Sequence, residues 1–77
     1  MAFLREQCVL GPDQQVGIAE LFARWQVWCQ AAGRTHPGTE QSFARDLWAA
    51  VPQLRPLRPT VGGRRTRCYG GIGLRPG

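Results

Sequence analysis

The arginines are the residues of this sequence best equipped for a defined chemistry, because a guanidinium group binds phosphate and carboxylate oxygens through several N–H donors. The chain has ten arginines and no lysine against five acidic residues, and its net charge is +5. Residues 1–39 carry three arginines and three acidic residues, whereas residues 40–77 carry seven arginines and two acidic residues. The whole net charge lies in the second half, which favours a polyanionic partner such as nucleic acid over a merely solvated basic face.

Cysteine and histidine offer little for catalysis or metal binding. Cys8, Cys29 and Cys68 are an odd number, lie far apart and form no C-x-x-C pair, and His36 is the only histidine. A tetrahedral metal site needs four ligands at short spacings, and a thiol nucleophile needs a base beside it. We therefore expect no metal, no cofactor and no enzymatic activity, with the thiols serving as small core side chains in a reducing compartment.

The length of 77 residues allows a single domain over residues 1–77, and an apolar content of 43% supports a small core. No apolar run approaches the roughly 18–20 residues that cross a membrane. The mixed charges within residues 1–6 do not fit a secretory signal. These features predict a cytoplasmic protein with no membrane contact and leave its oligomeric state open.

Two helices are predicted in the first half of the chain. The first covers residues 2–8 and ends before Gly11-Pro12, because the residue before proline is pushed out of the helical region. Residues 14–17 then form a brief linker or a short extended piece. The second helix covers residues 18–32, and Gly33 suits its C-cap. Its apolar residues recur at helical spacing and are Ile18, Leu21, Phe22, Trp25, Trp28, Cys29 and Ala32.

A third helix is predicted over residues 39–51 after a loop over residues 34–38, with Thr39 as its N-cap and Pro52 as its stop. One face is apolar and carries Phe43, Leu47, Ala50 and Val51. The opposite face carries Gln41, Arg45 and Trp48. An exposed tryptophan beside glutamine and arginine is unusual for a purely solvated surface, so Trp48 either contacts a partner or folds back over the edge of the core.

The sequence pattern of residues 54–75 predicts a β-hairpin. Residues 54–59 are extended but broken by prolines, which suits an edge strand, and Gly62-Gly63 forms the turn. Residues 67–75 alternate with period two, although three glycines weaken that strand. One side carries Cys68, Ile72 and Leu74, and the other carries Arg67, Tyr69 and Arg75. Because a lone hairpin must lie on an apolar surface, three helices closed by this hairpin predict an α+β winged helix, a helix-turn-helix variant.

Three motifs point to a known family: W-C-x-x-x-G at residues 28–33, T-x-x-x-F-x-x-x-L at residues 39–47 and Y-x-G-I-x-L at residues 69–74. Within a stretch of about residues 3–75, the sequence resembles the C-terminal domain of phage and plasmid primase–helicase replication proteins. There this region follows a superfamily 3 helicase domain of the poxvirus type. The resemblance implies a winged helix that binds DNA beside a replicative helicase or primase, in a bacterial cell or phage-infected host. The sequence has no Walker-type phosphate loop, so ATPase and primase activities are not carried over.

The leading interpretation is a DNA-binding winged helix that takes duplex or forked DNA. Gln41 and Arg45 are expected to read base edges, because glutamine suits adenine and arginine suits guanine. Trp48 would pack on the sugar–phosphate wall or stack on an unpaired base. The arginines between residues 55 and 67 would contact phosphates, which adds affinity without sequence information. The candidate DNA-contacting residues are Gln41, Arg45, Trp48, Arg55, Arg58, Arg64, Arg65 and Arg67.

The alternative interpretation is a protein-interaction module that docks on a replicative helicase, a primase or a host factor. Val27, Trp48 and Tyr69 favour it, since Val27 falls off the apolar stripe of its helix and is expected to reach solvent. Fold alone does not choose between the two roles.

Overall fold

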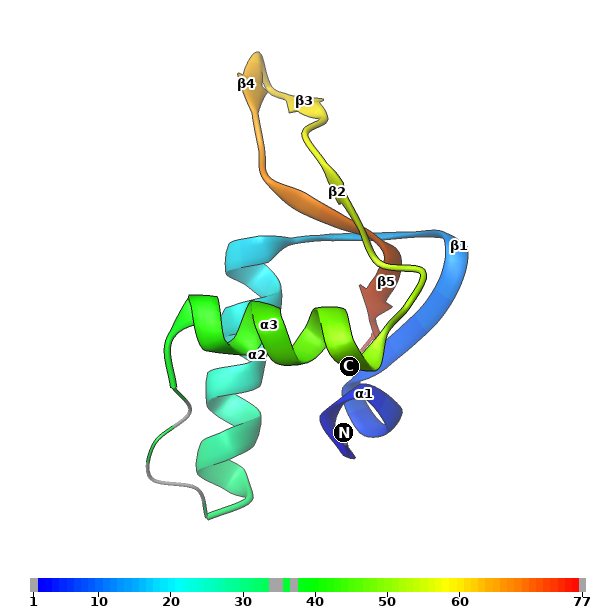
Figure 1. The fold of residues 1–77 in the computed structure, drawn as a ribbon. Helices are drawn as coiled ribbons and strands as arrows, with labels where there is room; N and C mark the ends of the chain where they lie inside the picture. The colour runs from blue at the N-terminus through cyan, green and yellow to red at the C-terminus, as the bar shows by residue number, and fades with distance from the viewer. Residues whose placement is uncertain (1, 34–35, 37, 77) are drawn as a thin grey trace.

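The structure is a computed structural model that describes residues 2–33, 36 and 38–76 (Figure 1). Its elements, in chain order, are α1 (Ala2–Gln7), β1 (Cys8–Gly17), α2 (Ile18–Ala31), α3 (Glu40–Ala50), β2 (Arg55–Leu57), β3 (Thr60–Val61), β4 (Arg64–Arg65) and β5 (Cys68–Leu74). The predicted α+β class is confirmed, and the three helices fall where they were expected to within one residue at each end. The predicted loop over residues 34–38 lies largely outside the described residues.

The sheet is three-stranded and antiparallel, with β5 in the centre and the order β1-β5-β2. The strands β2 and β5 form a hairpin that β3 and β4 continue as a second, two-stranded ladder. We call residues 55–74 the C-terminal hairpin. Figure 1 shows its β3–β4 tip standing clear of the helices, while α3 crosses in front of α2.

Strand β1 corrects the sequence prediction, which gave residues 14–17 only a short linker or extended piece. Residues 8–10 pair with residues 72–74, and residues 15–17 pair with residues 68–70. Between these two ladders, residues 11–14 leave the register as a bulge. Pro12 lies in that bulge, where the sheet needs no N–H donor from it, so the strand continues past a dipeptide that would end a helix.

One hydrophobic core joins the three helices to the sheet. Phe3 of α1 is fully buried, and its ring makes edge-on contacts with three other aromatic rings. The centroid distances are 5.3 Å to Trp25, 5.8 Å to Trp28 and 6.0 Å to Phe43. The prediction that Trp25 belongs to the core is confirmed, and Trp28 packs half-buried against it. Two buried side chains, Phe3 and Leu4, thus hold this six-residue helix against the core.

Strand β5 corrects the predicted alternation, which placed Tyr69 on the side opposite Cys68 and Ile72. Residues 68–73 are all buried: β1 and β2 cover the two edges of β5, and Trp48 of α3 packs against Tyr69. Its glycines allow this close packing. At Gly71, where φ is +89°, a Cβ atom would lie 2.9 Å from the carbonyl oxygen of Gln53. The glycines, which weaken the prediction of a strand from the sequence, are therefore what allows β5 to pack this closely against its neighbours.

We expect Gly71→Ala to lower the free energy of unfolding by about 2 kcal/mol or more, as measured by urea denaturation. A left-handed backbone conformation costs an L-residue roughly 1–2 kcal/mol, and the Gln53 carbonyl belongs to the backbone and cannot swing aside. Gly11→Ala is the matched control, since its Cβ would meet only the Gln14 side chain, at 3.6 Å. That variant should stay within about 0.5 kcal/mol. Equal losses in the two variants would contradict this account of β5.

Candidate nucleic-acid interface

The orientation of α3 is set by its first turn and by its buried face. The Ser42 backbone N–H donates to Thr39 Oγ1 at 3.1 Å, and the Thr39 N–H donates to Ser42 Oγ at 3.0 Å. This reciprocal capping satisfies N–H groups that would otherwise lack partners, and it confirms Thr39 as the N-cap. Phe43 and Leu47 are buried in the core. The opposite face of α3 is consequently turned outward.

That outward face is the predicted stripe of Gln41, Arg45 and Trp48, which we call the α3 stripe. All three side chains are exposed. Trp48 is 42% exposed, and its ring meets the Tyr69 ring edge-on, with a centroid distance of 6.2 Å and an interplanar angle of 88°. Trp48 therefore covers the edge of the core with one side and remains open on the other. Because Tyr69 belongs to β5, the contact also turns the α3 stripe toward the base of the C-terminal hairpin.

The tip of the C-terminal hairpin is a two-residue turn. Gly62 and Gly63 have φ angles of +59° and +80°, and positive φ at both positions is the geometry of a type I′ turn. Arg64 and Arg65 follow directly, pair with residues 61 and 60 of β3, and are exposed. The predicted glycine turn and basic tip are confirmed.

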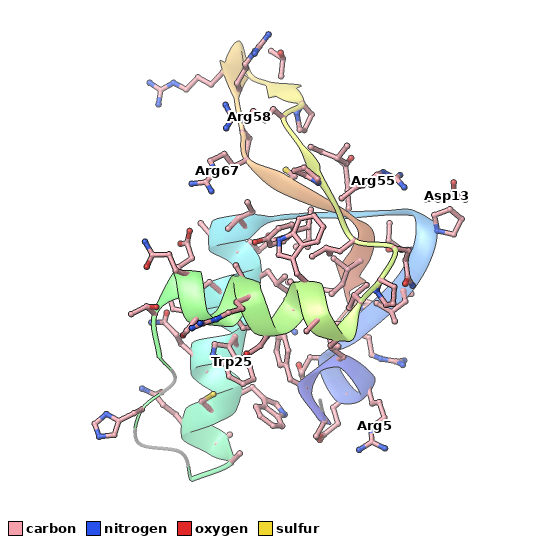
Figure 2. All side chains as sticks on the ribbon, in the orientation of Figure 1. Arg5, Asp13, Trp25, Arg55, Arg58 and Arg67 are labelled. Carbon is pink, nitrogen blue, oxygen red and sulfur yellow. The ribbon has the colours of Figure 1, made fainter. Side chains whose placement is uncertain are left out.

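The structure separates Arg55 from the other predicted phosphate contacts. Its Nη2 atom donates to the carbonyl oxygen of Pro12 at 3.1 Å, which ties β2 to the bulge of β1. Figure 2 shows Arg55 directed toward that bulge, near Asp13, and Arg58 and Arg67 on the other side of the hairpin. The remaining four arginines are exposed, and their side chains make no hydrogen bond or ion pair with any residue that the structure describes. We call these four the hairpin arginines: Arg58, Arg64, Arg65 and Arg67.

A groove of about 890 Å³ brings part of the hairpin together with the helices. Residues 64–68 form one wall, and residues 17–20 with Glu40 form the other, so the first turns of α2 and α3 open onto it. Glu20 and Glu40 are site residues that the sequence did not single out. The groove is lined by three arginines and these two carboxylates, so the net charge of its lining is positive. The carboxylates can accept hydrogen bonds inside it.

Tyr69 is a second residue whose role the sequence prediction missed. It is 5% exposed, and its hydroxyl makes no hydrogen bond with the described residues. Since no buried side-chain N or O atom among those residues lacks a partner, the Tyr69 hydroxyl keeps some exposure to solvent. Burial raises the pKa of Tyr69 above its ordinary value, while Arg67 opposes the shift and Glu40 adds to it. The hydroxyl is therefore a protonated donor at neutral pH.

The remaining reactive groups are the three cysteine thiols, all of which are buried. Burial raises the pKa of the Cys8 thiol to about 11, with Arg24 and Arg75 opposing the shift, so the thiol is protonated at neutral pH. Cys29 and Cys68 are also buried and free. Within the described ranges, no group of three or more His, Cys, Asp or Glu could hold a metal ion. In the same part of the chain, no helix is long and apolar enough to span a bilayer.

These features define a small α+β domain that presents an exposed helix face beside an arginine-rich hairpin. Among known proteins, no family model matches the chain, and no curated sequence matches it either. The chemistry of this surface is consequently the basis on which a function can be assigned.

Proposed function

We propose that the chain is a winged-helix DNA-binding module in which α3 is the recognition helix and the C-terminal hairpin is the wing. The element order supports this fold: a helix and a strand, then two helices, then a hairpin whose return strand pairs with the first strand. The observation that carries the function is the set of four exposed hairpin arginines with no partner among the described residues, beside the α3 stripe. Four unneutralised guanidinium groups on one hairpin attract a polyanion, and phosphates satisfy them.

The mechanism follows from the placement of these groups. The major groove of duplex DNA admits one α-helix, and the α3 stripe provides Gln41 for an adenine edge and Arg45 for a guanine edge. The hairpin arginines contact the neighbouring phosphates and fix the register of α3. With two base-reading side chains, sequence discrimination is modest, and most of the affinity comes from the backbone contacts.

The motifs that resemble phage and plasmid primase–helicase proteins supply the biological setting of the proposal. A module of this kind would act without catalysis of its own, holding DNA for a replicative helicase or primase in the cytoplasm of a bacterial cell or phage-infected host. The W-C-x-x-x-G and Y-x-G-I-x-L motifs mark positions that the fold uses: Cys29 and Ile72 are fully buried, and Tyr69 supports Trp48.

Salt dependence tests the proposal directly. If the four hairpin arginines contact phosphates, the logarithm of the duplex association constant should fall with the logarithm of salt concentration at a slope of about −3.6. Fluorescence anisotropy with a labelled duplex of about 20 base pairs measures this slope. The control is the same sequence with an uncharged methylphosphonate backbone, which should bind weakly and without salt dependence. A native affinity that is indifferent to salt would remove the proposal.

The alternative, a protein-interaction module, is favoured by one separate observation. Val27 is 62% exposed, as the sequence predicted, and lines a hollow on α2 together with Ala23 and Leu74. Under this alternative, Val27→Asp should abolish capture of a helicase or primase, while Arg64→Ala/Arg65→Ala leaves capture intact. DNA binding predicts the reverse pattern for duplex affinity.

A further inference from the structure

One part of the Trp48 indole contacts Tyr69, and the rest is exposed to solvent. The perpendicular contact with Tyr69 holds the ring, and 42% of the residue remains exposed on a helix face whose other members are Gln41 and Arg45. An aromatic ring that stands beside arginines with a free surface is a stacking platform for a nucleobase, since every base has a π-face. In a duplex that face is already covered by the neighbouring base pair, so only an unpaired base can use the platform.

The polar groups near this ring suit an unpaired nucleotide better than a second duplex backbone. Arg67 and Cys68 line the groove, and the next residue, Tyr69, contacts Trp48 through its ring. The arginine neutralises the phosphate of a nucleotide whose base stacks on Trp48, and the phenol supplies a hydrogen-bond donor.

We propose that the corner formed by Trp48, Tyr69 and Arg67 binds the first unpaired nucleotide, so that the preferred DNA is a duplex that continues into a single strand. This inference rests on the proposed function and names its substrate class. Trp48 stacks on the first unpaired base. Gln41 and Arg45 lie on the same face of α3, toward its N-terminus, and read the adjoining paired bases. The α3 stripe thus spans the junction between paired and unpaired DNA.

The test compares three DNAs that share one duplex: blunt-ended, with a single-stranded 5′ arm, and with a 3′ arm. The native chain should bind one of the armed DNAs about tenfold more tightly than the blunt duplex, which is the size of one base–aromatic stacking contact. Trp48→Leu should remove this preference, so that this variant binds the armed and the blunt DNA equally well. Trp48→Phe keeps a smaller ring and should retain part of the preference. Fluorescence of Trp25 and Trp28 shows whether each variant is folded.

Equal affinity of the native chain for blunt and armed DNA would overturn the inference while leaving the proposed function intact. An arm preference that survives Trp48→Leu would also overturn it. If the native chain binds none of the three DNAs, the proposed function itself fails.

Discussion

Arg64→Ala/Arg65→Ala should weaken duplex binding by about tenfold to a hundredfold at about 0.1 M salt and reduce the magnitude of the salt slope by about two. Both side chains are exposed next to the Gly62-Gly63 turn, and neither has a hydrogen-bond or ion-pair partner among the described residues. Their removal therefore takes no stabilising contact from the fold. Fluorescence anisotropy at several salt concentrations measures both quantities, and urea denaturation should show a change within about 0.5 kcal/mol.

Arg5→Ala/Arg75→Ala is the matched control, since it removes the same two charges elsewhere. Arg5 and Arg75 line a different hollow, and Figure 2 shows Arg5 beside α1, at the end of the molecule opposite the hairpin tip. Duplex affinity of this variant should stay within about twofold of the native value, because charges beyond a Debye length are largely screened. Equal losses in the two double variants would mean that net charge, and not the hairpin, attracts the DNA.

The helices of this fold could be predicted because their signals are local. The stripe of α2 repeats every three to four residues, and Thr39 with Pro52 brackets α3 within a short stretch of chain. The exposed face of α3 follows from the same periodicity, so the sequence alone suffices to place Gln41, Arg45 and Trp48 together on it. The Gly62-Gly63 turn is equally local, since only glycine adopts positive φ freely at both positions.

The features that the sequence did not predict depend on residues far apart in the chain. β1 is a strand because it pairs with β5 from the other end of the sequence, and no short-range pattern shows that Gly11-Pro12 can leave the register as a bulge. Arg55 and Arg58 cannot be told apart in the sequence. They differ in the structure because Arg55 donates a hydrogen bond to Pro12, which is far away in the chain. Tyr69 was assigned to the side opposite Cys68 and Ile72 because period two describes a strand with one buried face, whereas the side chains of β5 are buried on both faces.

Phe3→Ala should lower the free energy of unfolding by about 3–5 kcal/mol, a larger loss than the one expected for Gly71→Ala. Phe3 is fully buried, and its ring contacts Trp25, Trp28 and Phe43, so the truncation leaves a cavity among three aromatic rings that cannot collapse onto it. It also removes the main attachment of α1, a helix too short to persist alone. Urea denaturation measures the loss.

Phe3→Leu is the conservative counterpart, because it fills most of the same volume and should cost less than about 1.5 kcal/mol. A small domain has only about 5–15 kcal/mol of stability in total, so Phe3→Ala should be partly unfolded near physiological temperature, whereas Phe3→Leu stays folded. Since α1 leads directly into β1, which pairs with the central strand β5, loss of α1 loosens the end of the sheet opposite the hairpin. A Phe3→Ala variant as stable as the native chain would show that α1 lies on the core without contributing to it.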